Sequence, residues 1–269
     1  MRHPPVSVPM IAVAHGSRDP RAAATVGELL GAVRARRPDV SVHASFLDHA
    51  PPTPDQVLDG LARESRSSGA RQSIGGGWGA AGPAAVVLPL LLTPAYHSKT
   101  DIPGVLNRVR ALHPRLRLRT AGTLGPHPLL VDALERRLAE AGVPPGDPDT
   151  AVVLVSAGSS DASANATIAR TAREWRSRGW RDAVPAYASA AGPKPGEAVA
   201  ALLDAGAPRV AVASCFLAPG HFADKVREEA LSAGASAVSP VLGAAPEIAD
   251  LVVRRYDEAL EDVRGATAV

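Results

Sequence analysis

The chain has 269 residues, of which 46% are hydrophobic and 21% are charged, and this composition excludes an intrinsically disordered protein. Aromatic residues make up only 3% of the chain, which disfavours an aromatic-rich β-sandwich and favours helices packed on sheets through aliphatic side chains. The net charge of +2 comes without a concentrated basic stripe, so nucleic-acid binding is not expected. No run reaches the length of about 18 apolar residues that a membrane span requires. The single cysteine, Cys215, and an N-terminus unlike a signal peptide predict a cytoplasmic protein with a buried, inert thiol.

The first half of the chain alternates short apolar runs with amphipathic segments, which is typical of strands followed by helices. In chain order the pattern predicts a strand at 10–14, a helix at 21–36, a strand at 40–47, a helix at 55–66, a strand at 84–92, a helix at 102–112, a strand at 116–121 and a helix at 129–141. The glycine-rich segment 73–85 lacks the Gly-Lys-Ser/Thr ending of a phosphate loop, so we interpret it as a surface loop whose role the sequence leaves open.

A linker rich in proline and glycine, at 142–150, separates this half from a second series of the same kind. The second series predicts a strand at 151–155, a helix at 162–178, a strand at 183–188, a helix at 197–204, a strand at 209–216 and a helix at 221–233. Alternating strands and helices indicate parallel sheets with right-handed crossovers.

Three segments of the first half recur in the same order in the second, which indicates an internal duplication. The paired segments are 12–20 with 154–162, 91–99 with 216–224, and 123–134 with 241–252. We therefore predict an α/β protein of two tandem-repeated domains, each a parallel sheet flanked by helices. The N-terminal repeat, 1–142, is expected to carry the active site, and the C-terminal repeat, 150–269, is expected to be degenerate.

Two histidines follow predicted strands, at the edge of a parallel sheet where ligands usually bind. His15 comes directly after the first strand and His97 follows the third, and each lies among polar residues. Asp48 comes just after the second strand and could complete a divalent metal site with the two imidazoles. Asp48 could equally orient a histidine from behind, or serve only as a turn or helix-capping aspartate.

The second repeat has lost these groups. Ala157 stands where His15 would be, and Phe222 falls opposite His97 when the segments are aligned without gaps. His221 is one place away and could substitute only if its loop shifted, so its contribution stays open. One working site, in the first repeat, is the better interpretation.

The sequence resembles the sirohydrochlorin chelatase family, the class II chelatases of siroheme and cobalamin synthesis. The likeness rests on the segment Ala-His-Gly-Ser-Arg-Asp-Pro at 14–20, on Phe-Leu-Asp at 46–48 with its proline-rich turn, and on 91–103. It covers nearly the whole chain, because long members of that family are also tandem repeats. The resemblance implies a chelatase-like fold, His15 and His97 as the active-site histidines, and an acidic residue at Asp48.

The resemblance also implies a reaction, namely insertion of a divalent metal, Fe²⁺ or Co²⁺, into sirohydrochlorin by a lyase with no permanently bound cofactor. His15, His97 and Asp48 would hold the metal, and the two neutral imidazoles could accept the protons that leave the pyrrole nitrogens. Ser17, Arg18 and Lys99 are expected to bind the carboxylates of this anionic tetrapyrrole. Arg18 and Lys99 could instead be ordinary surface charges. Imidazole and carboxylate ligands accept both metals, so the sequence chooses neither iron nor cobalt, nor the pathway that the product feeds.

Two other functions fit the same residues. A non-catalytic metal-binding or metal-delivery protein would use the same histidines without a tetrapyrrole pocket. A phosphate-ester or nucleotide enzyme is weaker, because no glycine-rich phosphate turn follows the first strand. A tandem repeat can build within one chain the two-lobed cleft that a single-repeat chain would build by dimerising, so a monomer is expected.

Overall fold

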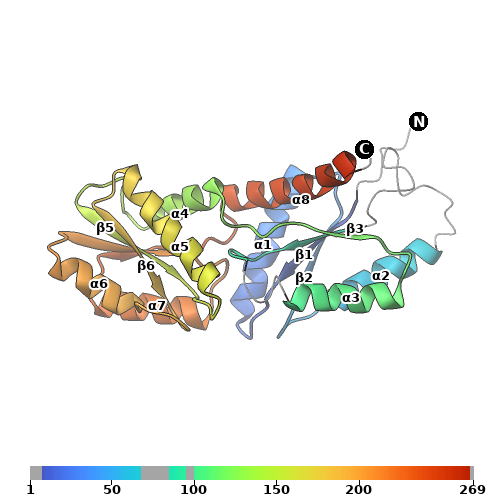
Figure 1. Cartoon of the computed structure of the whole chain (residues 1–269), viewed down its shortest axis with the longest axis horizontal. Coiled ribbons are helices and arrows are strands. Elements are labelled where there is room, and N and C mark those ends of the chain that lie inside the picture. Colours follow the sequence, from blue (N-terminus) through green and yellow to red (C-terminus); the bar gives the residue numbers. More distant parts are fainter. Residues whose placement is uncertain (1–7, 68–84, 95–99, 267–269) are drawn as a thin grey trace. The chain divides into compact units, whose positions relative to one another are not determined.

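The computed structural model describes residues 8–67, 85–94 and 100–266, and it contains two parallel four-stranded sheets flanked by helices (Figure 1). This confirms the predicted fold class. The strands are β1 (Met10–Ala14), β2 (Val42–Phe46), β3 (Ala85–Pro89), β4 (Leu118–Thr120), β5 (Thr150–Ser156), β6 (Asp182–Tyr187), β7 (Arg209–Ser214) and β8 (Ala237–Val238). The helices are α1 (Pro20–Arg36), α2 (Pro54–Ser67), α3 (Ile102–Leu112), α4 (Pro128–Glu140), α5 (Ala162–Trp175), α6 (Pro195–Asp204), α7 (His221–Ser232) and α8 (Pro246–Ala266), with a 3-10 turn at Arg176–Arg178.

The predicted elements are present, with differences at their ends. The strand expected at 84–92 runs only over β3, and the helix expected at 162–178 is α5 followed by the 3-10 turn. The sequence pattern did not predict β8 or α8 as separate elements. β8 is too short to show a period of its own, since it has only two residues.

Each sheet orders its strands in the same way. The first sheet runs β2-β1-β3-β4 and the second runs β6-β5-β7-β8, with every neighbouring pair parallel. All five residues of β1 and all seven of β5 are buried, as expected of central strands that are covered on both faces. The shared order supports an internal duplication.

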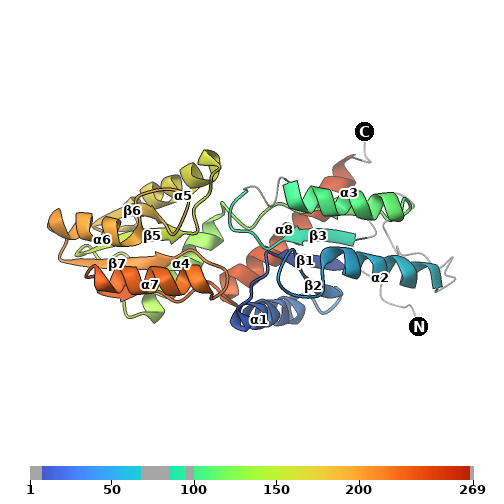
Figure 2. The same cartoon turned by 90° about the horizontal axis from the view of Figure 1, so that it is seen from below.

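The first compact unit contains β1 to β4, α1 to α3 and the part of α8 from residue 249 onward. Alternate residues of β1 and β3 pack against α2 and α3, which lie side by side (Figure 2). Helix α8 contacts the end of α1 instead, since Arg37 pairs with Asp257 and lies over the ring of Tyr256. The Tyr256 hydroxyl donates a hydrogen bond to the carbonyl oxygen of Val8, which ties α8 to the segment before β1.

The second compact unit contains β5 to β8 and the helices α4 to α7. Helices α6 and α7 lie side by side and pack on alternate residues of β5 and β7 (Figure 1). Helix α4 contacts α5, because the indole N–H of the buried Trp175 donates to Glu135 at 2.6 Å and Arg178 pairs with Asp132. The two units are thus built alike, with α8 contacting α1 in one and α4 contacting α5 in the other.

The compact units differ from the predicted sequence repeats, 1–142 and 150–269, in their last helices. Helix α4 belongs to the first repeat but lies in the compact unit of the second sheet. Helix α8 belongs to the second repeat but, from residue 249 onward, lies in the compact unit of the first sheet. Relative to the predicted repeats, α4 and most of α8 are therefore exchanged between the two compact units. The division of the sequence into repeats at 1–142 and 150–269 stays a prediction.

Candidate functional site

The turn after β1 is fixed by its own polar side chains. The Ser17 hydroxyl accepts a hydrogen bond from the Asp19 amide at 3.1 Å, and the Asp19 carboxylate caps α1 by accepting from the Arg21 amide at 2.9 Å. The Arg21 guanidinium hydrogen-bonds the same carboxylate and lowers the pKa of Asp19. His15 and Arg18 are exposed at this turn. Ser17 thus has a structural role, and its predicted contact with substrate stays a prediction.

His15 and Asp48 adjoin at the carboxyl edge of the first sheet. The parallel pairing of β1 with β2 continues past the strands, because the Leu47 amide donates to Ala14 at 3.0 Å and the Asp48 amide to His15 at 2.9 Å. Gly16 makes this approach possible, since it has φ +94° and a Cβ there would overlap the Asp48 carbonyl oxygen. The structure therefore brings together the backbones of two of the three residues that the sequence predicts as metal ligands.

The carboxylate of Asp48 lies beside the imidazole of His49, a residue that the sequence analysis overlooked. One carboxylate oxygen of Asp48 accepts a hydrogen bond from the His49 amide at 2.8 Å, and the other lies 3.3 Å from His49 Nε2. His49 has φ +63°, a left-handed conformation that is uncommon for a residue with a side chain. The sequence contained one signal for this residue, since His49 directly follows the candidate ligand Asp48. The Asp48 carboxylate therefore contacts both the backbone amide and the imidazole of His49.

His97 and Lys99, the remaining predicted site residues, lie outside the described residues, as does the glycine-rich segment 73–85 apart from Ala85, the first residue of β3. Their places relative to His15 stay predictions. Within the described part of the chain, no group of three or more His, Cys, Asp or Glu side chains is arranged to hold a metal ion. His15, Asp48 and His49 therefore do not form such a group, and a metal held by any two of them would need further ligands, from water or from outside those ranges.

The second sheet repeats the same turns without the residues that are predicted to bind metal. The Ser189 amide donates to Ala157 at 2.9 Å, as the Asp48 amide does to His15. Gly158 repeats the positive φ of Gly16, and Ala190, at φ +57°, repeats that of His49. The backbone of the site is thus a property of the repeated fold, whereas the imidazoles and the carboxylate belong to the first copy.

The aromatic residues at the start of α7 occupy the place that the sequence alignment pairs with His97. The rings of His221 and Phe222 lie 5.7 Å apart, and Phe222 is 43% exposed. Within the described ranges His221 belongs to no group of three or more His, Cys, Asp or Glu side chains that could hold a metal, and its contribution, which the sequence leaves open, stays open.

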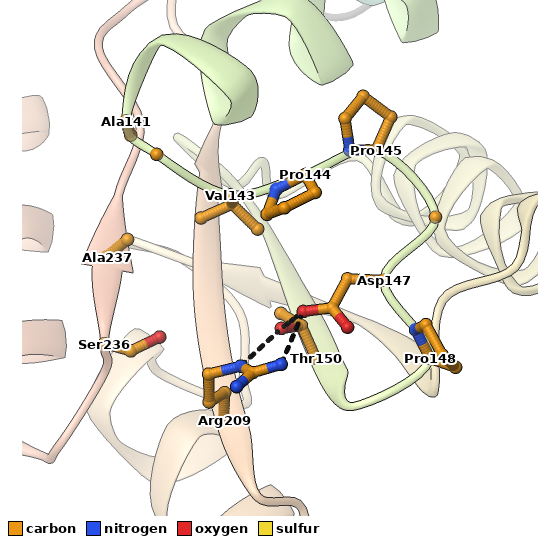
Figure 3. A pocket seen from close by; sticks show the side chains of 12 residues that line it. Ala141, Val143, Pro144, Pro145, Asp147, Pro148, Thr150, Arg209, Ser236 and Ala237 are labelled. Carbon is orange, nitrogen blue, oxygen red and sulfur yellow. Dashed lines mark hydrogen bonds and ion pairs between the residues drawn. The ribbon is translucent and has the colours of Figure 1, made fainter.

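A pocket of about 650 Å³ lies at the other end of the second sheet, near the residues that begin β5, β7 and β8 (Figure 3). Asp147 accepts hydrogen bonds there from the Thr150 hydroxyl at 2.5 Å and from Arg209 at 2.9 Å. The Thr150 bond, followed by the Asp149 amide and Arg209, lowers the pKa of Asp147. The pocket has no histidine, and parallel sheets bind their ligands at the opposite, carboxyl ends of the strands. It is therefore separate from the predicted site.

No helix within the described ranges is both long and apolar enough to cross a bilayer.

Among known proteins, the chain is similar to a sirohydrochlorin cobaltochelatase of Priestia megaterium, with 26% identity over 223 residues that cover 80% of this chain. It is 29% identical over 149 residues to a sirohydrochlorin ferrochelatase of Bacillus subtilis (strain 168), which covers 55% of this chain. The matched regions span 66% and 50% of these relatives, so the chain covers less than two thirds of either.

Solved structures give a similarity that extends over the whole fold. The structure of SirB from Bacillus subtilis with Fe³⁺ matches 95% of this chain and 96% of its own, with a TM-score of 0.75 and 25% identity. A SirB from Bacillus subtilis subspecies spizizenii in complex with cobalt matches with a TM-score of 0.72, and its 20% identity supports the fold alone. The CbiX family model matches residues 9–71, 78–141 and 151–259. The chain therefore belongs to the CbiX family.

Proposed function

We propose that this chain is a metallochelatase that inserts Fe²⁺ or Co²⁺ into sirohydrochlorin. Membership of the CbiX family and the similarity to two relatives named sirohydrochlorin chelatases support this activity. The structural observation that carries the proposal is the contact between His15 and Asp48 at the carboxyl edge of the first sheet, where parallel α/β sheets bind ligands.

Insertion requires two pyrrole nitrogens to lose their protons while the metal sheds water. The exposed imidazole of His15 can hold the metal through one ring nitrogen, or accept a pyrrole proton as a general base. We assign Asp48 to supply a carboxylate oxygen to the metal, and His97 to supply the second imidazole. This donor set accepts both iron and cobalt, in line with relatives named for each.

The substrate is an anionic tetrapyrrole, which requires cationic or hydrogen-bonding partners. Arg18 is exposed beside His15 and forms no ion pair within the described ranges, so it is available to a substrate carboxylate. We assign Ser17 and Lys99 to the same task, and we expect the product to feed siroheme or cobalamin synthesis. A cytoplasmic monomer remains our expectation. A light-scattering mass of twice 27.6 kDa would contradict the monomer.

The test is the absorbance change of sirohydrochlorin on insertion of Co²⁺ or Fe²⁺, measured for the unaltered chain and for His15→Ala and His97→Ala. We expect the chain to accelerate insertion well beyond the spontaneous rate, and each variant to lose about 100-fold or more of that acceleration. The matched control is His43→Gln on β2, because His43 contacts Ser41 rather than the predicted site. A chain that binds metal without accelerating insertion would favour the alternative, a metal-delivery protein that uses the same histidines.

A further inference from the structure

The turn after β2 carries two metal-binding side chains in consecutive positions, Asp48 and His49. We propose that His49 is an additional metal ligand of this chain, and that Asp48 and His49 together receive the divalent ion beside His15. This inference rests on the proposed function, because it assigns the residues that take up the metal before insertion.

The spacing of the two side chains suits one ion. Two ligands that each lie about 2.1 Å from a metal, at angles of about 90–109°, are about 3.0–3.4 Å apart. The Asp48 Oδ2 to His49 Nε2 distance is 3.3 Å, within the range that two ligands of one ion have. The Asp48 side chain is 61% exposed and that of His49 is 35% exposed, so a hydrated ion can reach both.

The carboxylate is held in place while one of its oxygens faces the imidazole. The His49 amide donates to Asp48 Oδ1 at 2.8 Å, which leaves Oδ2 directed at the His49 ring. The Asp48 amide is bound in turn to the His15 carbonyl oxygen, so the pair is fixed next to the residue predicted to hold the metal during insertion. An oxygen and an imidazole nitrogen suit iron and cobalt.

The second repeat separates the role of the backbone from that of the side chains. Ser189 and Ala190 occupy the same turn, and Ala190 has φ +57° compared with +63° for His49. The left-handed turn therefore belongs to the fold and does not depend on a histidine. What the first repeat adds is an imidazole and a carboxylate that face each other.

The experiment is a titration of the chain with Co²⁺ alone, followed by the visible absorption of the bound ion, without any tetrapyrrole. We expect His49→Ala to raise the apparent Kd for Co²⁺ at least about ten-fold, because even the loss of a group that only orients a metal ligand commonly costs about 10–100-fold in affinity. The double variant Asp48→Ser/His49→Ala should raise it further, and its residues already occupy this turn in the second repeat, so it should fold. His43→Gln serves as the control and should bind Co²⁺ like the unaltered chain.

A Co²⁺ Kd for His49→Ala that stays within two-fold of the original would overturn the inference, whether or not the melting temperature falls. A second measurement needs no variant. Substoichiometric Co²⁺ should shift or broaden the NMR signals of the His49 ring, and unchanged signals would equally overturn the inference. Because neither assay contains sirohydrochlorin, a chain that binds Co²⁺ through His49 but inserts no metal would contradict the proposed function and leave this inference standing.

Discussion

The backbone amide of Asp48 donates a hydrogen bond to the carbonyl oxygen of His15, with an N···O distance of 2.9 Å. The two residues are 33 positions apart in sequence and are joined because β1 and β2 are parallel neighbours whose pairing continues beyond their ends. A main-chain contact of this kind fixes the positions of both Cα atoms. Side chains that bind a metal or accept a proton must be held in this way if they are to act on one substrate.

Gly16 should be essential to that contact. In Gly16→Ala the new Cβ would overlap the Asp48 carbonyl oxygen, and φ +94° is unfavourable for alanine. We expect the free energy of unfolding, measured by urea denaturation, to fall by about 2–4 kcal/mol. Gly27→Ala is the control, because a Cβ at that position of α1 meets nothing within 4 Å and should stabilise the helix by up to about 1 kcal/mol. A Gly16→Ala chain as stable as the original would show that the two loops can separate without cost.

The hydroxyl of Tyr256 should stabilise the packing of α8 in the first unit. Tyr256 is fully buried and donates to the Val8 carbonyl oxygen, so Tyr256→Phe removes that donor and should cost about 1–2 kcal/mol. Burial also raises the pKa of Tyr256 to about 12, against an ordinary value of 10.0. Its contribution is therefore complete below pH 10 and is lost as the pH rises towards 12.

Urea denaturation of the original chain and Tyr256→Phe at several pH values tests both statements. The original chain should lose more stability than the variant between pH 10 and pH 12. If both chains lose the same free energy of unfolding over that range, the pKa of Tyr256 does not differ between the folded and unfolded states.

Glu247, in the first turn of α8, should make the second unit sensitive to acid. Arg136 of α4 donates to both Glu247 oxygens, at 2.6 to 3.0 Å, and these bonds lower the pKa of Glu247 below its ordinary 4.5. The pair therefore stabilises the fold above pH 4.5, and this contribution is lost as the pH falls through the lower folded-state pKa.

We expect Glu247→Gln to lower the free energy of unfolding at pH 7 by about 1 kcal/mol or less, because the arginine is partly exposed. The difference between the two chains should shrink as the pH falls below 4.5. Glu261→Gln, at an exposed position of the same helix, is the control. A difference that grows on acidification would have the wrong sign for this linkage.

The thiol of Cys215 should be unreactive in the folded chain. Cys215 is only 4% exposed, as the apolar run around it predicted, and burial raises its pKa to about 12. The thiolate is the reactive form, so a thiol reagent at pH 8 should label the folded chain very slowly and label one equivalent once the chain is unfolded. Rapid labelling under native conditions would show that β7 opens at its carboxyl end.

The sequence determined most of the elements, all but β8 and α8 among those described. Apolar periodicity located β1 and α3 to the residue, and the two echoing series of strands and helices predicted two sheets of one design. It also placed His15 and Asp48 at strand ends, which parallel pairing then brings together. These features follow from local patterns and from the rule that parallel strands share a carboxyl edge.

The tertiary structure alone decided which sheet each final helix covers. Local sequence patterns do not show which sheet α4 or α8 packs with. The contacts of α4 with α5 and of α8 with α1 place each helix in its unit. The same holds for His49. Its imidazole faces Asp48 because a left-handed backbone turns it there, and that conformation is set by the turn after β2 rather than by the residue itself, as Ala190 demonstrates in the second repeat.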